Sequence, residues 1–415
     1  MKRLSAFFWL LMILVATIAA HEDDLFWDID SLFDESWAET PAEEYIDEPA
    51  MSVLSTLKRR GLTVDASYEF QGGIVPGWDT APWHFTGEEV YSWGPAVKMD
   101  SRIGLDAQVS EVFRIFTVFT FSIPGSSFSL GDFFFDYNIL NTVFVRAGKY
   151  EHSWGVSPNY SFANLLARVP YGSAGGVSHI FKTDIPIGIG GFQALAVTRA
   201  DLTGSMLPGW NDIGYGGKYN LAFRWADFDM GVFYQDNMAL RTFLSVNTTI
   251  GNTELYNEWL AAVNIHSDKN TGFAANVGFI RDFFGSKLTV NGELFFNGEG
   301  NSYFYRPETG ILEADTLPFI KGFNLAFNMI YRFSAKGSPR FFMQVLSAPA
   351  QSTAQLIPGF RLSPLSHAEI YLAVPMALGS KDGYYYTHTA DPKSRPFSIM
   401  LLVTLKGSIQ AGYYY

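Results

Sequence analysis

The chain has 415 residues, of which 48% are hydrophobic, 16% aromatic and 17% charged. Soluble domains carry about a quarter charged residues, so this chain is poor in charge. Cysteine is absent, which excludes disulfide bonds and thiolate metal sites. The net charge of −12 gives no basic surface of the kind that binds nucleic acid, and no nucleic-acid partner is expected.

Residues 1–20 have the features of a secretory signal peptide. Lys2 and Arg3 form a charged start, an apolar stretch runs from Ala6 to Val15, and small residues follow up to Ala20. The apolar stretch is short for a membrane span, which disfavours the alternative of an N-terminal anchor. The segment predicts export from the cytoplasm.

Residues 21–61 are predicted to form an acidic leader with short helices. Residues 21–50 contain twelve acidic residues and no Lys or Arg. Apolar side chains recur there every three or four positions from Phe26 to Trp37, which is the period of an amphipathic helix. The leader would remain on the periplasmic side after export.

From residue 62 to the C-terminus the hydrophobic pattern has a period of two, which is typical of strands. The alternating stretches run for about 8–13 residues, whereas ordinary strands average about five or six and about 9–11 cross a bilayer. Residues 97–109 show the pattern, with apolar side chains alternating with Lys98, Asp100 and Arg102. Charges in the middle of the polar face favour a water-filled lumen over the core of a secreted β-sandwich.

We therefore predict an all-β fold, a transmembrane antiparallel up-and-down β-barrel over residues 62–415. Eighteen candidate strands can be placed, and merging two short ones would leave sixteen, so 16–18 strands are expected. The longest connections, including residues 151–178, fall on one side of this barrel and the short ones on the other. Extracellular loops and periplasmic turns differ in this way.

The last residues carry the most specific signal in the sequence. Ile409, Tyr413 and Tyr415 share the apolar face of the final strand, with Ala411 as the weakest member of the row. Over residues 62–415 the architecture resembles bacterial outer-membrane porin-like barrels, in the version found in spirochaetes. The resemblance implies contact with outer-membrane lipid and recognition of the C-terminal strand by the barrel assembly machinery.

A second, weaker resemblance to porin-like families lies between Arg146 and Gly155. An Arg and a Gly precede the pair Trp154 and Gly155 in this stretch. No Asn-Pro-Ala motif occurs in the chain, which disfavours the fatty-acid channels that open with such a hatch motif.

The sequence gives little support for an enzyme, and no cofactor is expected. The seven His residues show neither His-x-x-x-His nor His-Glu-x-x-His spacing, and no Gly-x-Ser-x-Gly elbow is present. Catalytic dyads assembled across strands remain open, because spacing along the chain does not reveal them.

The predicted inner face carries twelve bases and six acids, and the acids are Asp100, Asp106, Glu254, Glu258, Glu293 and Glu369. The candidates for an eyelet in the lumen are Lys98, Arg102, Arg114, Arg146, Arg224, Arg241 and Arg332. Two interpretations stay open. The charges either pair and keep the lumen wet, or form an electropositive eyelet that favours anionic solutes.

The connection at residues 151–178 is rich in apolar side chains for an exposed loop. Trp154, Tyr160, Phe162 and Arg168 are the candidates for a constriction that folds into the lumen. The alternatives are an extracellular interaction surface and packing on neighbouring loops.

These patterns predict an outer-membrane channel for passive diffusion of small hydrophilic solutes, with anion preference as an open option. The alternatives are a substrate-selective channel for hydrophobic solutes and a surface adhesin that displays loops on a barrel scaffold. The acidic leader is either a solvated tail or a plug at the periplasmic mouth. No strand face is distinct enough to indicate an interface, so a homo-oligomer is left open.

Overall fold

The structure is a computed structural model. The residues that it describes are 61–84, 86–87, 91–123, 127–152, 154–160, 178–198, 209–236, 239–263, 272–298, 302–306, 311–315, 321–334, 339–380, 383, 385 and 396–414. The predicted signal peptide, and the predicted leader up to residue 60, lie outside these residues. Among the described residues, no helix is both long enough and apolar enough to span a bilayer.

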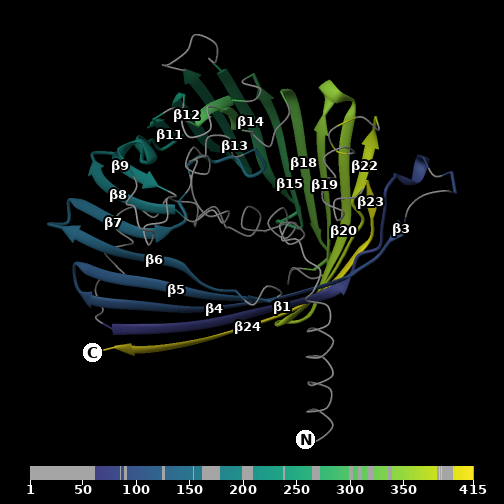
Figure 1. Cartoon of the computed structure of the whole chain (residues 1–415), viewed down its shortest axis with the longest axis horizontal. Helices are drawn as coiled ribbons and strands as arrows, with labels where there is room; N and C mark the ends of the chain where they lie inside the picture. The colour runs from purple at the N-terminus through teal and green to yellow at the C-terminus, as the bar shows by residue number, and fades with distance from the viewer. Residues whose placement is uncertain are drawn as a thin grey trace, which may run out of the picture.

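Eighteen antiparallel strands close into one barrel (Figure 1). In chain order they are β1 (Gly61–Ile74), β4 (Pro95–Ser110), β5 (Phe113–Ile123), β6 (Ser127–Ile139), β7 (Val143–Tyr150), β8 (Ser178–Ile187), β9 (Gly190–Thr198), β10 (Gly214–Ala222), β11 (Asp227–Gln235), β12 (Leu240–Ile250), β13 (Thr253–Val263), β14 (Gly272–Phe283), β15 (Leu288–Asn297), β18 (Gly322–Arg332), β19 (Arg340–Ala348), β20 (Thr353–Leu365), β21 (Ala368–Ala373) with its continuation β22 (Met376–Gly379), and β24 (Met400–Tyr414) with β23 (Phe397–Ser398) before it.

Small elements decorate the connections between these strands. They are the strands β2 (Gly77–Trp78) and β3 (Tyr91–Ser92), the hairpin of β16 (Ser302–Arg306) and β17 (Ile311–Asp315), and the 3-10 helices η2 (Pro82–His84), η4 (Trp210–Asp212) and η5 (Pro349–Gln351). The predicted fold class is confirmed, at the upper end of the expected strand number. Each of the eighteen candidate strands corresponds to one strand of the barrel, and no two of them merge.

The first and last strands close the barrel. β1 pairs with β24 along its whole length, from Gly61 opposite Tyr414 to Ile74 opposite Leu401. The other side of β1 pairs with β4. Closure satisfies the backbone N–H and C=O groups that an open sheet edge would expose to lipid.

Alternation along each strand separates an outer face from an inner one. In β24, Leu401, Val403 and Leu405 are 40–42% exposed, whereas Leu402 and Thr404 between them are 3% and 8% exposed. The exposed side chains of this row are apolar, as in the lipid-facing band of an outer-membrane barrel. The alternation that predicts strands therefore also assigns their two faces.

The connections differ between the two ends of the barrel. At one end, called the turn end here, the strands are joined by the short connections 111–112, 140–142, 188–189, 223–226, 251–252, 284–287, 333–339 and 366–367. The long connections, among them 151–177 and 199–213, lie at the other end, the loop end. Gly61 and Tyr414 lie at the turn end, because the up-and-down order of eighteen strands starts and finishes there.

A solute pathway in the barrel lumen

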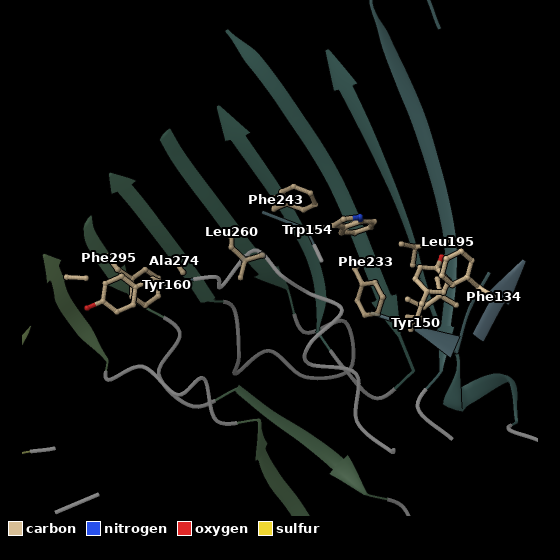
Figure 2. Close-up of a cluster of buried hydrophobic side chains, with 13 residues drawn as sticks. Phe134, Tyr150, Trp154, Tyr160, Leu195, Phe233, Phe243, Leu260, Ala274 and Phe295 are labelled. Carbon is tan, nitrogen blue, oxygen red and sulfur yellow. The ribbon is translucent and has the colours of Figure 1, made fainter. Parts of the chain in front are cut away.

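The chain after β7 turns into the barrel instead of leaving it. Residues 154–160, called the inner segment here, carry Trp154 and Tyr160, which are 1% and 4% exposed. The ring of Trp154 packs on Phe243 of β12 with 5.4 Å between centroids, and Tyr160 stacks on Phe295 of β15 at 5.1 Å (Figure 2). The inner segment therefore lies against inward-facing side chains of the wall.

Gly216 on β10 makes room for the Trp154 ring. A Cβ atom added at Gly216 would lie 2.7 Å from the ring, closer than real contacts allow. A side chain at this position would therefore displace Trp154. This role of Gly216 could not be predicted from its position in a strand, since a glycine in a strand has several common explanations.

Glu293 on β15 is the main polar anchor of the inner segment. Its carboxylate accepts hydrogen bonds from Ser157 Oγ at 2.8 Å, from the Asn159 backbone N–H at 2.9 Å and from the Tyr160 backbone N–H at 3.2 Å. The Asn159 side-chain amide donates to the same carboxylate at 2.6 Å. Glu293 is 4% exposed, so these charge-assisted bonds form away from bulk water.

Glu258 on β13 holds the start of the same segment. It is 0% exposed, and its Oε1 accepts hydrogen bonds from the backbone N–H groups of Val156 and Ser157, the latter at 3.3 Å. A carboxylate that accepts hydrogen bonds from backbone N–H groups fixes the path of the chain, because these donors cannot change direction unless the backbone itself moves. Glu258 and Glu293 are called the anchor carboxylates below.

Asparagine side chains also form hydrogen bonds with the inner segment. Asn159 donates to Asn291 Oδ1 on β15 at 3.0 Å and accepts a hydrogen bond from Asn328 on β18 at 2.7 Å. Asn276 on β14 donates to Ser157 Oγ at 2.7 Å. Four neighbouring strands thus contribute polar groups to one stretch of loop.

The other side of the inner segment is tied to β9. Trp154 Nε1 donates to Gln193 Oε1 at 2.7 Å, and His152 Nε2 lies 3.1 Å from the same oxygen. The Gln193 amide donates in turn to Asp184 on β8 at 2.8 Å. His152 and the inner segment are therefore held to the wall between β9 and β18.

Two titratable groups of this connection lie outside the strands and have shifted pKa values. Burial, with a smaller effect of the charge on Lys182, lowers the pKa of His152 to about 4. Burial raises the pKa of Tyr160 above its ordinary range. His152 is therefore neutral near pH 7, and its Nε2–H donates to Gln193.

We expect acidification to loosen this end of the inner segment. A lowered pKa means that the docked state loses stability as the pH falls from about 6.5 to about 4, and has its full stability above that window. Single-channel current should become larger or noisier across this range. In His152→Gln, which keeps a donor but cannot take up a proton, this part of the pH dependence should disappear. An unchanged pH dependence in that variant would contradict the role of His152.

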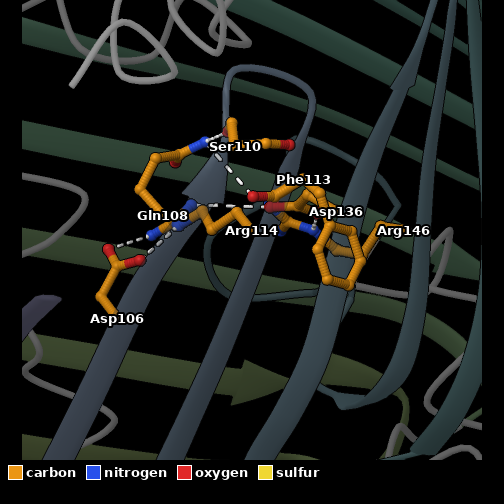
Figure 3. A network of polar contacts seen from close by, with 7 residues as sticks. All are labelled: Asp106, Gln108, Ser110, Phe113, Arg114, Asp136 and Arg146. Atoms are coloured by element: carbon orange, nitrogen blue, oxygen red, sulfur yellow. Dashed lines mark hydrogen bonds and ion pairs between the residues drawn. The ribbon is translucent and has the colours of Figure 1, made fainter. Parts of the chain in front are cut away.

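Charged side chains line the wall formed by β4 to β7. Arg114 forms an ion pair with Asp106 at 2.7 Å and approaches Asp136 at 3.5 Å, and Arg146 pairs with Asp136 at 2.6 Å (Figure 3). The Arg146 guanidinium also lies 4.3 Å from the centroid of the Phe134 ring. These charges form a chain of alternating sign across adjacent strands.

The remaining lumen candidates on strands lie on β4, β12 and β18. Lys98 pairs with Asp100 at 2.8 Å, and Arg102 shares the inward face of β4 with them. Arg241 is 1% exposed on β12. Arg332 lies at the turn end of β18 and donates to Thr289 Oγ1 at 2.9 Å. The predicted bases that lie on strands therefore come from β4, β5, β7, β12 and β18.

The placement of Arg224 on a strand is wrong. β10 ends at Ala222, and Arg224 lies exposed in the turn 223–226. The turn is closed by a hydrogen bond from the Phe223 backbone N–H to the Ala226 carbonyl at 2.9 Å. Alternation predicted a longer strand because the aromatic residues of the turn continue the apolar row.

The sequence also undercounted the acids of the inner face. Further carboxylates share that face, among them Asp65, Glu69, Asp136, Asp184, Asp229 and Asp282. Lys182 is an additional base, paired with Asp184 at 3.0 Å, and Lys218 pairs with Asp229 at 2.9 Å. Acids therefore balance the bases in the described part of the lumen. Phe162 and Arg168 lie outside the described residues.

Solved structures with the same architecture exist. The chain is similar to Pseudomonas aeruginosa OpdQ with a TM-score of 0.54 at 7% identity, covering 84% of this chain and 98% of that one. For P. aeruginosa OccK5 (OpdH) the TM-score is 0.52 at 10% identity, over 83% and 98% of the two chains. For Acinetobacter baumannii OccAB4 it is 0.51 at 8% identity, over 85% and 100%. The chain has a porin fold.

At these identities the likeness concerns the fold alone. A scan against protein families and a search of curated proteins gave no match. A porin fold with an apolar outer band places the protein in the outer membrane. The role of the lumen has to be argued from its own side chains.

Proposed function

We propose that the protein is an outer-membrane channel through which small hydrophilic solutes diffuse passively. The observation that carries this proposal is the inner segment, which narrows a barrel whose inner face is polar and charged. Transport of this kind needs no covalent chemistry and no cofactor. The spirochaete-type character of the barrel belongs to this proposal as well.

The path for solute follows from the distribution of side chains. The anchor carboxylates hold the inner segment against the wall from β13 to β18, while the charged wall from β4 to β7 carries Arg102, Arg114 and Arg146. Alternating charges keep water in the lumen and offer partners to both ends of a polar solute. We propose that Trp154 and Tyr160 act as the constriction by fixing how far the segment reaches inward.

Ion conductance in planar bilayers tests the proposal. The refolded chain should give discrete current steps, as a water-filled pore does. A liposome-swelling assay with neutral sugars of increasing size should give a cutoff. A chain that inserts fully but passes no current would support the adhesin alternative and contradict the channel.

We expect weak ion selectivity with a contribution from Arg102. This side chain is exposed on the inner face, and the structure records no ion pair for it among the described residues. Its replacement should therefore remove a positive charge that mobile ions experience. In a salt gradient, the reversal potential of Arg102→Ala should move toward cation preference, and that of the control Arg102→Lys should not. A shift of the same size in both variants would contradict this role.

The assembly machinery, outer-membrane lipid and solutes are the partners in this proposal, with a homo-oligomer left open. Ile409 is 75% exposed on the outer face, and Tyr413 lies opposite Leu62 of β1. Tyr415 follows directly and lies outside the described residues.

Deletion of Tyr415 should lower the amount of assembled barrel without affecting export. The physical reason is the loss of the last aromatic side chain of the lipid-facing row that the machinery reads. Heat-modifiable barrel in outer-membrane fractions is the measurement, with total exported protein as the control. Equal amounts of barrel with and without Tyr415 would count against the signal.

A further inference from the structure

Three polar side chains form a buried row on the inner face beside the inner segment. Ser245 on β12 lies directly opposite Glu258 on β13, which lies directly opposite Asn276 on β14. Their exposed fractions are 2%, 0% and 1%. Cross-strand neighbours have Cβ atoms about 4.5–5.5 Å apart, so the three side chains share one small volume.

Each member of this row has an oxygen that makes no hydrogen bond. These atoms are Ser245 Oγ, Glu258 Oε2 and Asn276 Oδ1. The other atoms of Glu258 and Asn276 are occupied: Glu258 Oε1 accepts backbone N–H groups of the inner segment, and Asn276 Nδ2 donates to Ser157 Oγ at 2.7 Å and to Glu293 Oε2 at 3.2 Å.

The hydrogen bonds described for the anchor carboxylates bring no positive charge to the row. The hydrogen bonds that reach Glu258 and Glu293 from described residues come from neutral donors. Asp229 lies on β11 directly opposite Ser245. Its carboxylate forms an ion pair with Lys218 at 2.9 Å. Two carboxylates buried without a base are costly unless a cation or protons compensate them.

We propose that the row binds a hard divalent cation, with Ca²⁺ as the best match. Glu258 Oε2, Asn276 Oδ1 and Ser245 Oγ would be its protein ligands, with Glu293 close by as a second carboxylate. Carboxylate, amide and hydroxyl oxygens are what Ca²⁺ prefers, and its flexible coordination tolerates ligands from three strands completed by water. The described residues hold no group of three or more His, Cys, Asp or Glu side chains suited to a metal, and this site instead combines carboxylates with neutral oxygens.

Such an ion would stiffen the constriction. Glu258 would bind the cation through one oxygen and the inner segment through the other, and Ser157 of the segment contacts both Glu258 and Glu293. Occupancy would therefore couple the ion to the position of Trp154 and Tyr160. This consequence rests on the proposed channel function, whereas binding itself does not.

Calorimetric titration of the refolded full-length barrel with Ca²⁺ tests the site directly. We expect binding with a dissociation constant of about 0.1–1 mM, as in extracellular Ca²⁺ modules, and a higher temperature of heat modification in Ca²⁺ than in a chelator. Mg²⁺, which demands a tighter octahedron, should bind more weakly. No heat of binding and no shift of the heat-modification temperature would overturn the proposal and leave water as the occupant.

Three variants localise the ion. Glu258→Gln keeps the acceptor for the inner segment and removes the charge, so the Ca²⁺ affinity should fall at least about tenfold. Ser245→Ala, which breaks no hydrogen bond described in the structure, keeps the test open if Glu258→Gln does not fold, and it should weaken binding more mildly. Glu254→Gln is the matched control on the inner face of β13, and should bind Ca²⁺ like the wild type.

Conductance separates this proposal from the channel itself. Ca²⁺ should reduce current noise in the wild type and have no such effect in Glu258→Gln. A barrel that conducts but binds no Ca²⁺ would overturn the cation site and leave the channel standing. A barrel that binds Ca²⁺ but passes no current would overturn the channel and leave the site. Equal Ca²⁺ affinity in Glu258→Gln and the wild type would place the ion elsewhere and overturn the assignment.

Discussion

Replacing Glu293 with alanine should release the inner segment and raise the single-channel conductance severalfold. The carboxylate accepts four hydrogen bonds from Ser157, Asn159 and Tyr160. Bonds to a charged acceptor contribute about 1.5–3 kcal/mol each, and the buried donors left behind would seek water instead. The barrel wall should survive, because the backbone ladder of β15 with β14 and β18 does not depend on this side chain.

Glu254→Ala is the matched control for this experiment. Glu254 also faces inward, from β13, but it accepts a hydrogen bond from Asn247 at 2.8 Å and has no recorded contact with the inner segment. Its conductance should stay close to that of the wild type. If Glu293→Ala leaves the current unchanged, or if both variants raise it equally, the segment does not set the width of the pore.

The second large effect should come from a cation on the lipid-facing side. Ile103 is 48% exposed on the outer face near the middle of β4, next to the inward-facing Arg102. Arginine near the bilayer midplane costs about 2–4 kcal/mol, so Ile103→Arg should strongly reduce the yield of folded barrel. Refolding into lipid vesicles, followed by a heat-modifiability gel, measures this yield.

The neighbouring substitution Arg102→Ile supplies the comparison. It places an apolar side chain in the wet lumen, where the cost of exposure is small. Its folded yield should stay near that of the wild type. Equal losses in both variants would mean that the inner and outer faces of β4 are assigned wrongly.

The alternation of apolar and polar residues was enough to predict most of the fold. A period of two indicates both that a segment is a strand and which residues lie on each of its two faces. It placed Lys98 and Arg102 on the same inward face of β4 that the register with β1 shows. The alternation did not place Asp136 of β6 on the inner face. The register of β6 with β5 shifts between Thr117 and Phe119, and this shift interrupts the alternation. Irregularities of this kind depend on pairing between strands, which a single sequence does not contain.

The hydrogen bonds that hold the inner segment could not be predicted from the sequence, for a different reason. Glu258 and Glu293 were expected on the inner face, but their hydrogen-bond partners lie about a hundred residues earlier in the chain. The apolar content of residues 151–178 indicated an inward fold as one of three options. The spacing of residues along the chain did not indicate which strands the loop would contact, because its contacts come from side chains of six strands, β9, β12, β13, β14, β15 and β18.

The pairing of β1 with β24 has a consequence for how the molecule is made. β1 is synthesised before the sixteen barrel strands that separate it along the chain from its partner β24. Until β24 is made, both edges of the growing sheet have unpaired backbone groups, which favours aggregation, and joining such distant segments is intrinsically slow. We therefore expect the yield of assembled barrel to depend on holdase-type chaperones that delay folding until β24 has been made.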